Sequence, residues 1–214
     1  MTPRERLSRS FLIIIALVGW TGLVLQLAVA VRTGWRHSQP AWYSVLGALS
    51  YFTVLTNLWV TVLASARVAR VSARHWLSRP GTLAAGAVYI AVVGIIYSLV
   101  LRTLWSPSGM HKAADVLLHD LMPALYLLWW LLFAPKGGLT WSDPLKWLTY
   151  PLAYFAFLLL LGRGTGRYLY PFADIHALGL GAVVRNGVLL LLLFWGLGSA
   201  AVLISRVGGT ASRS

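Results

Sequence analysis

The 214-residue chain contains no cysteine. Thiol catalysis, disulfide bonds and thiolate metal sites are therefore excluded. Charged residues are also scarce, at 11% of the chain, and only 5 residues are Asp or Glu. Soluble domains have roughly 25% charged residues, so the composition excludes an ordinary soluble domain.

Apolar residues are abundant instead, at 58% of the chain with a mean hydropathy of +0.74. They form six long runs, and a run of roughly 20 residues is enough to cross a bilayer. We therefore predict an all-α polytopic membrane protein, a bundle of six transmembrane helices in a single integral membrane domain over residues 1–214. The predicted helices cover about residues 11–31, 42–66, 82–104, 112–133, 144–161 and 182–205.

The first apolar run raises the alternative of a secretory signal peptide, since Ala28-Val29-Ala30 resembles a cleavage site. The apolar core of a signal peptide has roughly 7–15 residues, whereas run 11–31 is long enough to span a bilayer. We therefore expect a retained first helix.

The net charge is +13, and the basic residues lie mainly between the apolar runs. Segments on the predicted side of the N-terminus contain 11 Lys and Arg, against 7 on the opposite side. This bias predicts that both termini are cytoplasmic. Attraction to anionic lipid head groups explains the remaining excess, and we expect no nucleic-acid partner because no nucleic-acid-binding motif is present.

One polar stripe interrupts the second apolar run. At ~100° per residue, four polar side chains share one helix face, namely Ser50, Thr53, Thr56 and Asn57. Unpaired polar groups in hydrocarbon cost several kcal/mol, so these side chains need partners on other helices. The stripe either joins helices through hydrogen bonds, or it contains a nucleophile, Thr53, which needs a neighbouring base.

His119 is the one histidine inside a predicted helix, and an ionisable residue in a span indicates a functional site. Asp115, one turn earlier, would orient its imidazole, and Tyr126 follows on the same predicted face. Alternatively, Asp115 and Asp120 lie near the outer interface, solvated or paired with Arg102 or Lys112.

A metal site would use His111, Asp115 and His119, which stand at i, i+4 and i+8. The sequence has no specific ligand motif, so we expect no metal.

Several of these features resemble the androgen-induced protein family of six-helix membrane proteins and its bacterial relatives. They are Phe52-Thr53 in the second helix, His119 followed by Pro123 in the fourth, and Gly166-x-x-x-Tyr170-Pro171-Phe172 before the sixth. Animal members hydrolyse fatty acid esters of hydroxy fatty acids with an intramembrane threonine and histidine. Where the animal pattern has an acidic residue three positions after the threonine, this chain has Thr56.

The resemblance implies a lipid-ester hydrolase in a bacterial inner membrane, with Thr53 as nucleophile and His119 as base. Ser50, Thr56, Asn57, Asp115 and Tyr126 would support the site or the substrate, and Asn57 or backbone donors would stabilise the oxyanion. The expected partners are membrane lipids and a lipid-like substrate, with no cofactor and the oligomeric state open. The alternative is a non-catalytic protein, either a small transporter or a lipid-binding scaffold.

Overall fold

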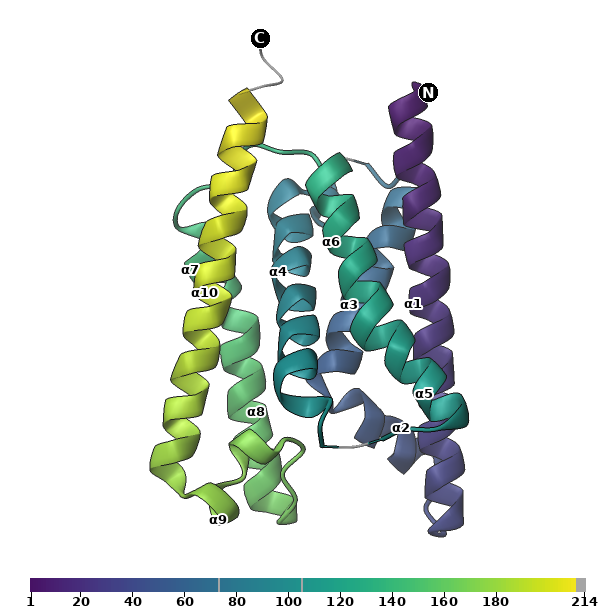
Figure 1. Ribbon diagram of the computed structural model, residues 1–214, viewed down its shortest axis with the longest axis vertical. Helices are drawn as coiled ribbons and strands as arrows, with labels where there is room; N and C mark the ends of the chain where they lie inside the picture. Colours follow the sequence, from purple (N-terminus) through teal and green to yellow (C-terminus); the bar gives the residue numbers. More distant parts are fainter. Residues whose placement is uncertain (73, 105, 211–214) are drawn as a thin grey trace. The chain divides into compact units, whose positions relative to one another are not determined.

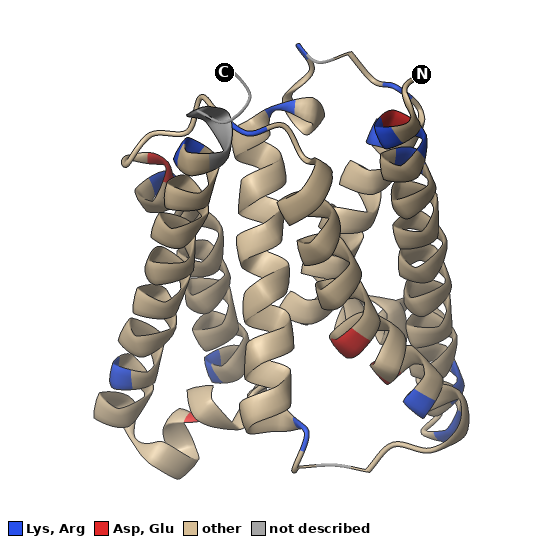
Figure 2. Ribbon diagram, turned by 45° about the horizontal axis from the view of Figure 1, so that its top comes forward, with Lys and Arg blue, Asp and Glu red and all other residues tan. Residues whose placement is uncertain are grey.

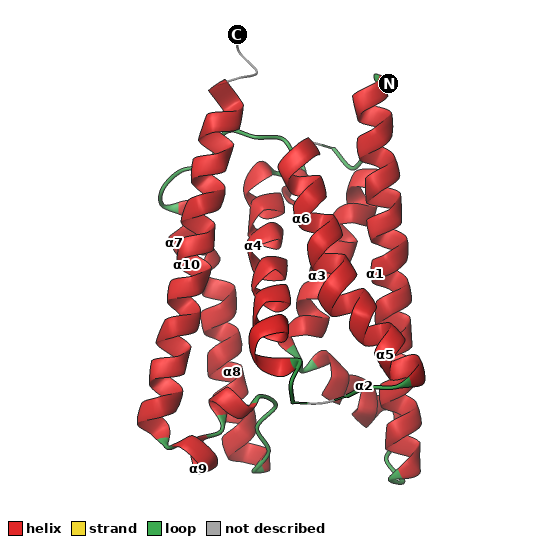
Figure 3. Ribbon diagram, viewed as in Figure 1, coloured by secondary structure: helices red, strands yellow, loops and turns green. Residues whose placement is uncertain are grey.

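The computed structural model describes residues 1–72, 74–104 and 106–210, so the polar tail 211–214 lies outside it. Every regular element in these ranges is a helix, as Figure 3 shows. Within the described residues, five helices are long and apolar enough to cross a membrane, and a bent pair would make a sixth. The prediction of an all-helical, membrane-embedded protein is confirmed at this level.

The helices form two compact units, residues 1–135 and 136–214 (Figure 1). The first contains α1 to α6 and the second α7 to α10. Each unit is described by itself below, and the single domain over 1–214 stays a prediction. In both units the Lys and Arg residues lie mostly toward helix ends, and the helix middles are largely uncharged (Figure 2).

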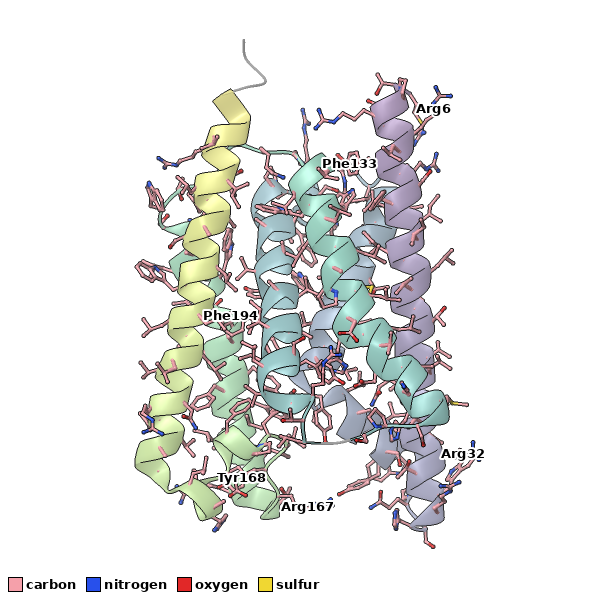
Figure 4. All side chains as sticks on the ribbon, viewed as in Figure 1. Arg6, Arg32, Phe133, Arg167, Tyr168 and Phe194 are labelled. Atoms are coloured by element: carbon pink, nitrogen blue, oxygen red, sulfur yellow. The ribbon has the colours of Figure 1, made fainter. Side chains whose placement is uncertain are left out.

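Helix α1, Pro3–Arg36, is longer than the predicted 11–31 because the polar leader belongs to it. The side chain of Thr2 accepts from the backbone of Glu5, and Glu5 returns a bond to the backbone of Thr2. This capping box begins the helix before the apolar run. Arg6 and Arg32 lie near its two ends (Figure 4).

The prediction of one continuous helix over about residues 42–66 is wrong. The chain forms α2, Ala41–Leu49, and α3, Phe52–Val68, which meet at an angle of 81°. The hydroxyl of Ser50 donates to the carbonyl of Leu46 at 2.8 Å, and Tyr51 is extended. A side chain that bonds to the preceding turn competes with helix continuation, which fits a break at this position.

Two of the other spans contain a π-helical turn. Helix α4, Pro80–Ile96, continues into η2, Tyr97–Leu101. Helices α5, Gly109–Val116, and α6, Met122–Phe133, are joined by η3, Leu117–Leu121. Pro123 accounts for the π-helical turn η3. In a regular α-helix its ring would clash with the carbonyl of His119, and proline has no backbone N–H to donate to that carbonyl.

Close packing in the first unit depends on two glycines of α1. A Cβ atom on Gly19 would lie 2.1 Å from Oγ1 of Thr61, and one on Gly22 would lie 2.6 Å from Cδ2 of Leu118. Small residues let helix backbones approach closely in membranes. They allow both α3 and the α5–α6 span to pack on α1, the arrangement seen in Figure 1.

The second unit contains α7, Asp143–Trp147, α8, Thr149–Thr165, and α10, Leu180–Thr210. Helix α8 ends at Gly166, whose φ of 70° favours glycine. The connection to α10 holds two short helices, η4, Pro171–Ala173, and α9, Ile175–Leu178. It is anchored where Asn186 Nδ2 donates to the carbonyl of Phe172 at 2.9 Å.

Candidate functional site

The bend between α2 and α3 changes the predicted polar stripe. Thr53 becomes the second residue of α3 and is half-buried, with Thr56 and Asn57 fully buried beyond it. Ser50 lies outside α3, at the C-terminal end of α2, so the helical spacing that grouped it with Thr53 does not hold. The prediction that Ser50 shares a helix face with Thr53 is therefore wrong, because that face requires one continuous helix.

Asn57 connects the start of α3 to the π turn of the fourth span. Its Nδ2 donates to the carbonyl oxygen of Thr53 at 2.8 Å and to that of Leu118 at 3.1 Å. Leu118 is the residue before His119. The Asn57 side chain therefore connects the helical turn that contains Thr53 to the turn that contains His119. Both hydrogens of the amide are thereby used, which argues against Asn57 as an oxyanion donor.

The first turn of a helix has N–H groups without partners inside the helix. The N–H of Thr53 is such a group, and it makes no hydrogen bond to any residue in the described ranges. A backbone donor at Thr53 is therefore better suited to bind an oxyanion than the Asn57 side chain.

The second part of the site is a buried group of Tyr97, Asp115 and His119. Asp115 is 6% exposed, and its Oδ2 accepts a hydrogen bond from the hydroxyl of Tyr97. Its Oδ1 lies 3.2 Å from Nδ1 of His119. The rings of Tyr97 and His119 stack with centroids 4.1 Å apart and planes inclined by 22°.

The surroundings of Nδ1 define the tautomer of neutral His119. This nitrogen lies 3.1 Å from the backbone carbonyl oxygen of Asp115 and 3.2 Å from its carboxylate Oδ1. A carbonyl oxygen can only accept, so Nδ1 carries the hydrogen. Nε2 then has the free lone pair, and the imidazole is set up to accept a proton there.

Asp120 has a separate partner. Its Oδ1 pairs with the guanidinium of Arg102, which also lies over the Tyr97 ring at 4.9 Å from the centroid. Hydrogen bonding to Asp120 raises the pKa of Arg102 above its ordinary value. Pairing with Arg102 was one of the alternatives predicted for Asp115 and Asp120. It is confirmed for Asp120. Asp115 lies beside His119 instead.

Tyr126 lies elsewhere in the first unit. It is fully buried, and its hydroxyl donates to the carbonyl of Leu83 at 3.3 Å. Leu83 is near the start of α4 and Tyr97 follows its end, which separates them by roughly 20 Å along the axis. Tyr126 thus packs against the opposite end of α4 from the His119 group.

Two further relationships bear on the predicted site. His119 makes no hydrogen bond to Thr53 among the residues that the structure describes. In the same ranges, no three His, Asp or Glu side chains form a group that could hold a metal ion, including His111, Asp115 and His119.

Sequence reasoning missed Tyr97, which was seen only as one polar residue of the third helix. A signal was available, because Tyr97 and Arg102 stand near the end of that helix and Asp115 and Asp120 stand near the start of the next. The hairpin between the two spans brings them together.

Comparison with known protein families, with curated proteins and with solved structures gave no match for this chain. The resemblance to the androgen-induced protein family therefore stays a prediction. Of its motifs, Phe52-Thr53 and His119 lie in the first unit, and Gly166 to Phe172 lie in the second.

Proposed function

We propose that the protein is a membrane-embedded hydrolase of lipid esters, with Thr53 as nucleophile and His119 as general base. Fatty acid esters of hydroxy fatty acids are the substrate class that the family resemblance suggests. The single observation that carries the proposal is the environment of His119. Its Nδ1 is hydrogen-bonded to the backbone carbonyl of the buried Asp115 and lies 3.2 Å from the Asp115 carboxylate, which leaves Nε2 as a proton acceptor inside a transmembrane span.

The reaction has two halves. Thr53 Oγ1 attacks the ester carbonyl carbon while Nε2 of His119 accepts the hydroxyl proton. The tetrahedral intermediate then breaks its bond to the leaving alkoxide, which takes the proton from the imidazolium, and an acyl-threonine remains. Water attacks this acyl group in the second half, giving its proton to Nε2, and release of the fatty acid returns that proton to Thr53.

Each remaining residue of the group has a role in this scheme. Asp115 fixes the ring of His119 and stabilises the imidazolium, and Tyr97 in turn holds the carboxylate of Asp115. The N–H of Thr53 is placed to bind the developing oxyanion. The substrate has to bring Thr53 and His119 within reach, as catalytic hydrogen bonds commonly tighten only once substrate is bound.

The location suits a lipid substrate. Helices this apolar keep the site within the bilayer, where an ester with long acyl chains can enter from the side. We place the protein in a bacterial inner membrane with cytoplasmic termini, from the excess of basic residues on that side and the family resemblance.

A fluorophosphonate probe tests the proposal. We expect it to label the purified protein at Thr53, with labelling lost in Thr53→Ala and His119→Ala but kept in Thr53→Ser. Thr149→Ala and His176→Ala are matched controls, since both residues lie in the second unit and should label as the wild type does. Tryptic mass spectrometry identifies the modified residue.

A wild-type protein that is folded but unlabelled would contradict the hydrolase. The buried tyrosine, aspartate and histidine would then support a non-catalytic membrane protein in which His119 carries protons during transport.

A further inference from the structure

A cavity of about 600 Å³ lies at the end of the first unit where α1 begins and α3 and α6 end. Figure 4 labels Arg6 and Phe133 at this end. Four arginines and one glutamate line the cavity, namely Arg4, Arg9, Arg67, Arg70 and Glu5. We call it the arginine pocket, and its charge is strongly positive.

Two of these arginines have unused hydrogen-bond donors. The Nε atoms of Arg9 and Arg67 are buried and donate to no partner. Neither guanidinium forms a hydrogen bond or an ion pair with any residue in the described part of the chain. A buried donor without a partner destabilises a protein, and more so when it is charged, so an anion that pairs with these guanidinium groups would stabilise the fold.

The acidic residue of the pocket does not neutralise them. Oε2 of Glu5 accepts from the backbone of Thr2 at 2.8 Å as part of the capping box of α1. The other two arginines have contacts of their own, since Arg4 donates to the carbonyl of Leu132 at 2.9 Å and Arg70 to Sδ of Met1 at 2.9 Å.

Contacts between helices hold the pocket in shape. Trp129 donates to the hydroxyl of Ser8 at 3.1 Å, and the rings of Phe11 and Phe133 lie 5.6 Å apart. These contacts join α1 to α6 beside the arginines. The pocket also has apolar walls, Leu12 and Phe133, so its surface offers both an anion site and a place for an apolar group.

General basic bias explains arginines near the ends of membrane helices, but it does not explain why two arginines that line one pocket pair with no residue in the described part of the chain. A planar guanidinium pairs with phosphate oxygens through two parallel hydrogen bonds. We propose that the arginine pocket binds a phosphate group, with Arg9 and Arg67 as its main ligands. The group comes either from the head of an anionic lipid or from free phosphate.

This proposal is independent of the hydrolase. Under the predicted topology the pocket faces the cytoplasmic leaflet, where anionic lipids provide phosphate groups at the depth of helix ends. Tyr97, Asp115 and His119 lie in η2, α5 and η3, and none of them lines the arginine pocket, which is therefore a separate site.

The test uses the full-length protein in detergent and follows its unfolding temperature. Inorganic phosphate is titrated against sodium chloride of equal ionic strength, and dioleoyl phosphatidylglycerol is titrated against dioleoyl phosphatidylcholine. The wild type is compared with Arg9→Gln/Arg67→Gln. The matched control is Arg32→Gln/Arg36→Gln, which removes the same charge from the opposite end of α1, where both side chains are exposed.

We expect phosphatidylglycerol, phosphate or both to raise the unfolding temperature of the wild type. The concentration of that ligand at half-saturation should be at least tenfold higher for Arg9→Gln/Arg67→Gln and unchanged for the control. Stabilisation by phosphatidylglycerol alone identifies a lipid head group as the ligand, and stabilisation by inorganic phosphate as well identifies a site for free phosphate. Absence of stabilisation by either ligand, or an equal loss in both double variants, would overturn the proposal.

The glutamine variant removes two half-buried charges and has to fold for this comparison. If it does not, Arg9→Lys/Arg67→Lys keeps the charge but removes the planar donors, and we expect a loss of about threefold or more. Lysine variants that bind as tightly as the wild type would exclude the guanidinium contacts on which the proposal depends.

Discussion

The ring of Tyr97 stacks on the ring of His119 with centroids 4.1 Å apart, and each residue belongs to a π-helical turn. Such turns are rare and occur frequently at functional sites. Here the two π turns lie on neighbouring spans and bring together the aromatic ring, the imidazole and the carboxylate of Asp115. The relationship suggests that the irregular backbone in both spans serves this one group.

The hydroxyl of Tyr97 can be tested without disturbing the stack. Tyr97→Phe keeps the ring but removes the donor to the buried carboxylate of Asp115. We expect the free energy of unfolding to fall by about 1–3 kcal/mol, because a buried acceptor loses its partner. Denaturation in mixed micelles measures this, with Tyr43→Phe on the exposed face of α2 as the control. Equal stability of the two variants would contradict the role of the hydroxyl.

Two aspartates five residues apart provide a second test. Asp115→Asn replaces the carboxylate beside Nδ1 of His119, whereas Asp120→Asn removes the partner of the exposed Arg102. If His119 is the base, the rate of fluorophosphonate labelling should fall about 10²–10⁴-fold in Asp115→Asn. It should be nearly unchanged in Asp120→Asn. Equal rates for the two variants would show that Asp115 does not orient the histidine.

The apolar runs were enough to predict an all-helical, membrane-embedded fold, because length and hydropathy determine which segments can span a bilayer. The break at Ser50 and Tyr51 was not predictable in this way. Neither residue is a proline or glycine, and an apolar run gives no sign of an 81° bend. The extension of α1 toward Pro3 had a local signal, the Thr2 and Glu5 capping box, which the apolar pattern alone overlooks.

For the site, the proximity of Asp115 and His119 follows from their spacing of four residues on a helix, and Oδ1 of Asp115 lies 3.2 Å from Nδ1 of His119, whereas the orienting role of Asp115 stays a prediction. The partnership with Tyr97 depends on how two spans pack, which a single sequence does not contain. Likewise, Tyr126 shares a predicted face with His119, but its hydroxyl reaches Leu83 near the other end of α4.

We expect Asn57 to contribute more to the free energy of unfolding than Asn186, a half-buried asparagine in the second unit. Asn57→Ala removes two hydrogen bonds from a fully buried amide, those to the carbonyls of Thr53 and Leu118. We expect a loss of about 1–3 kcal/mol in the free energy of unfolding. Asn186→Ala removes the bond to Phe172 from a half-buried position and should cost less. A larger effect at Asn186 would be inconsistent with Asn57 as the link between α3 and η3.

Gly19 lies where α1 closely approaches α3, and we expect that it cannot be replaced by a larger residue without loss of stability. A methyl group there would lie 2.1 Å from Oγ1 and 2.9 Å from Cγ2 of Thr61, and 3.0 Å from Cε of Met122. Gly19→Ala should therefore destabilise the protein by about 1–3 kcal/mol through overpacking. Gly47→Ala is the matched control, since a Cβ atom on Gly47 has no neighbour within 4 Å and the change should be neutral or stabilise by up to about 1 kcal/mol.

The cause of the Gly19 effect can be isolated with Thr61→Ala, which removes both of the threonine atoms that the new methyl group would meet. Thr61→Ala alone should also destabilise, because its hydroxyl donates to the carbonyl of Asn57 at 2.7 Å. If the clash is with Thr61, the double variant should be more stable than the sum of the two single effects predicts, by at least about 0.5 kcal/mol. Strict additivity would show that α1 and α3 do not meet at this pair.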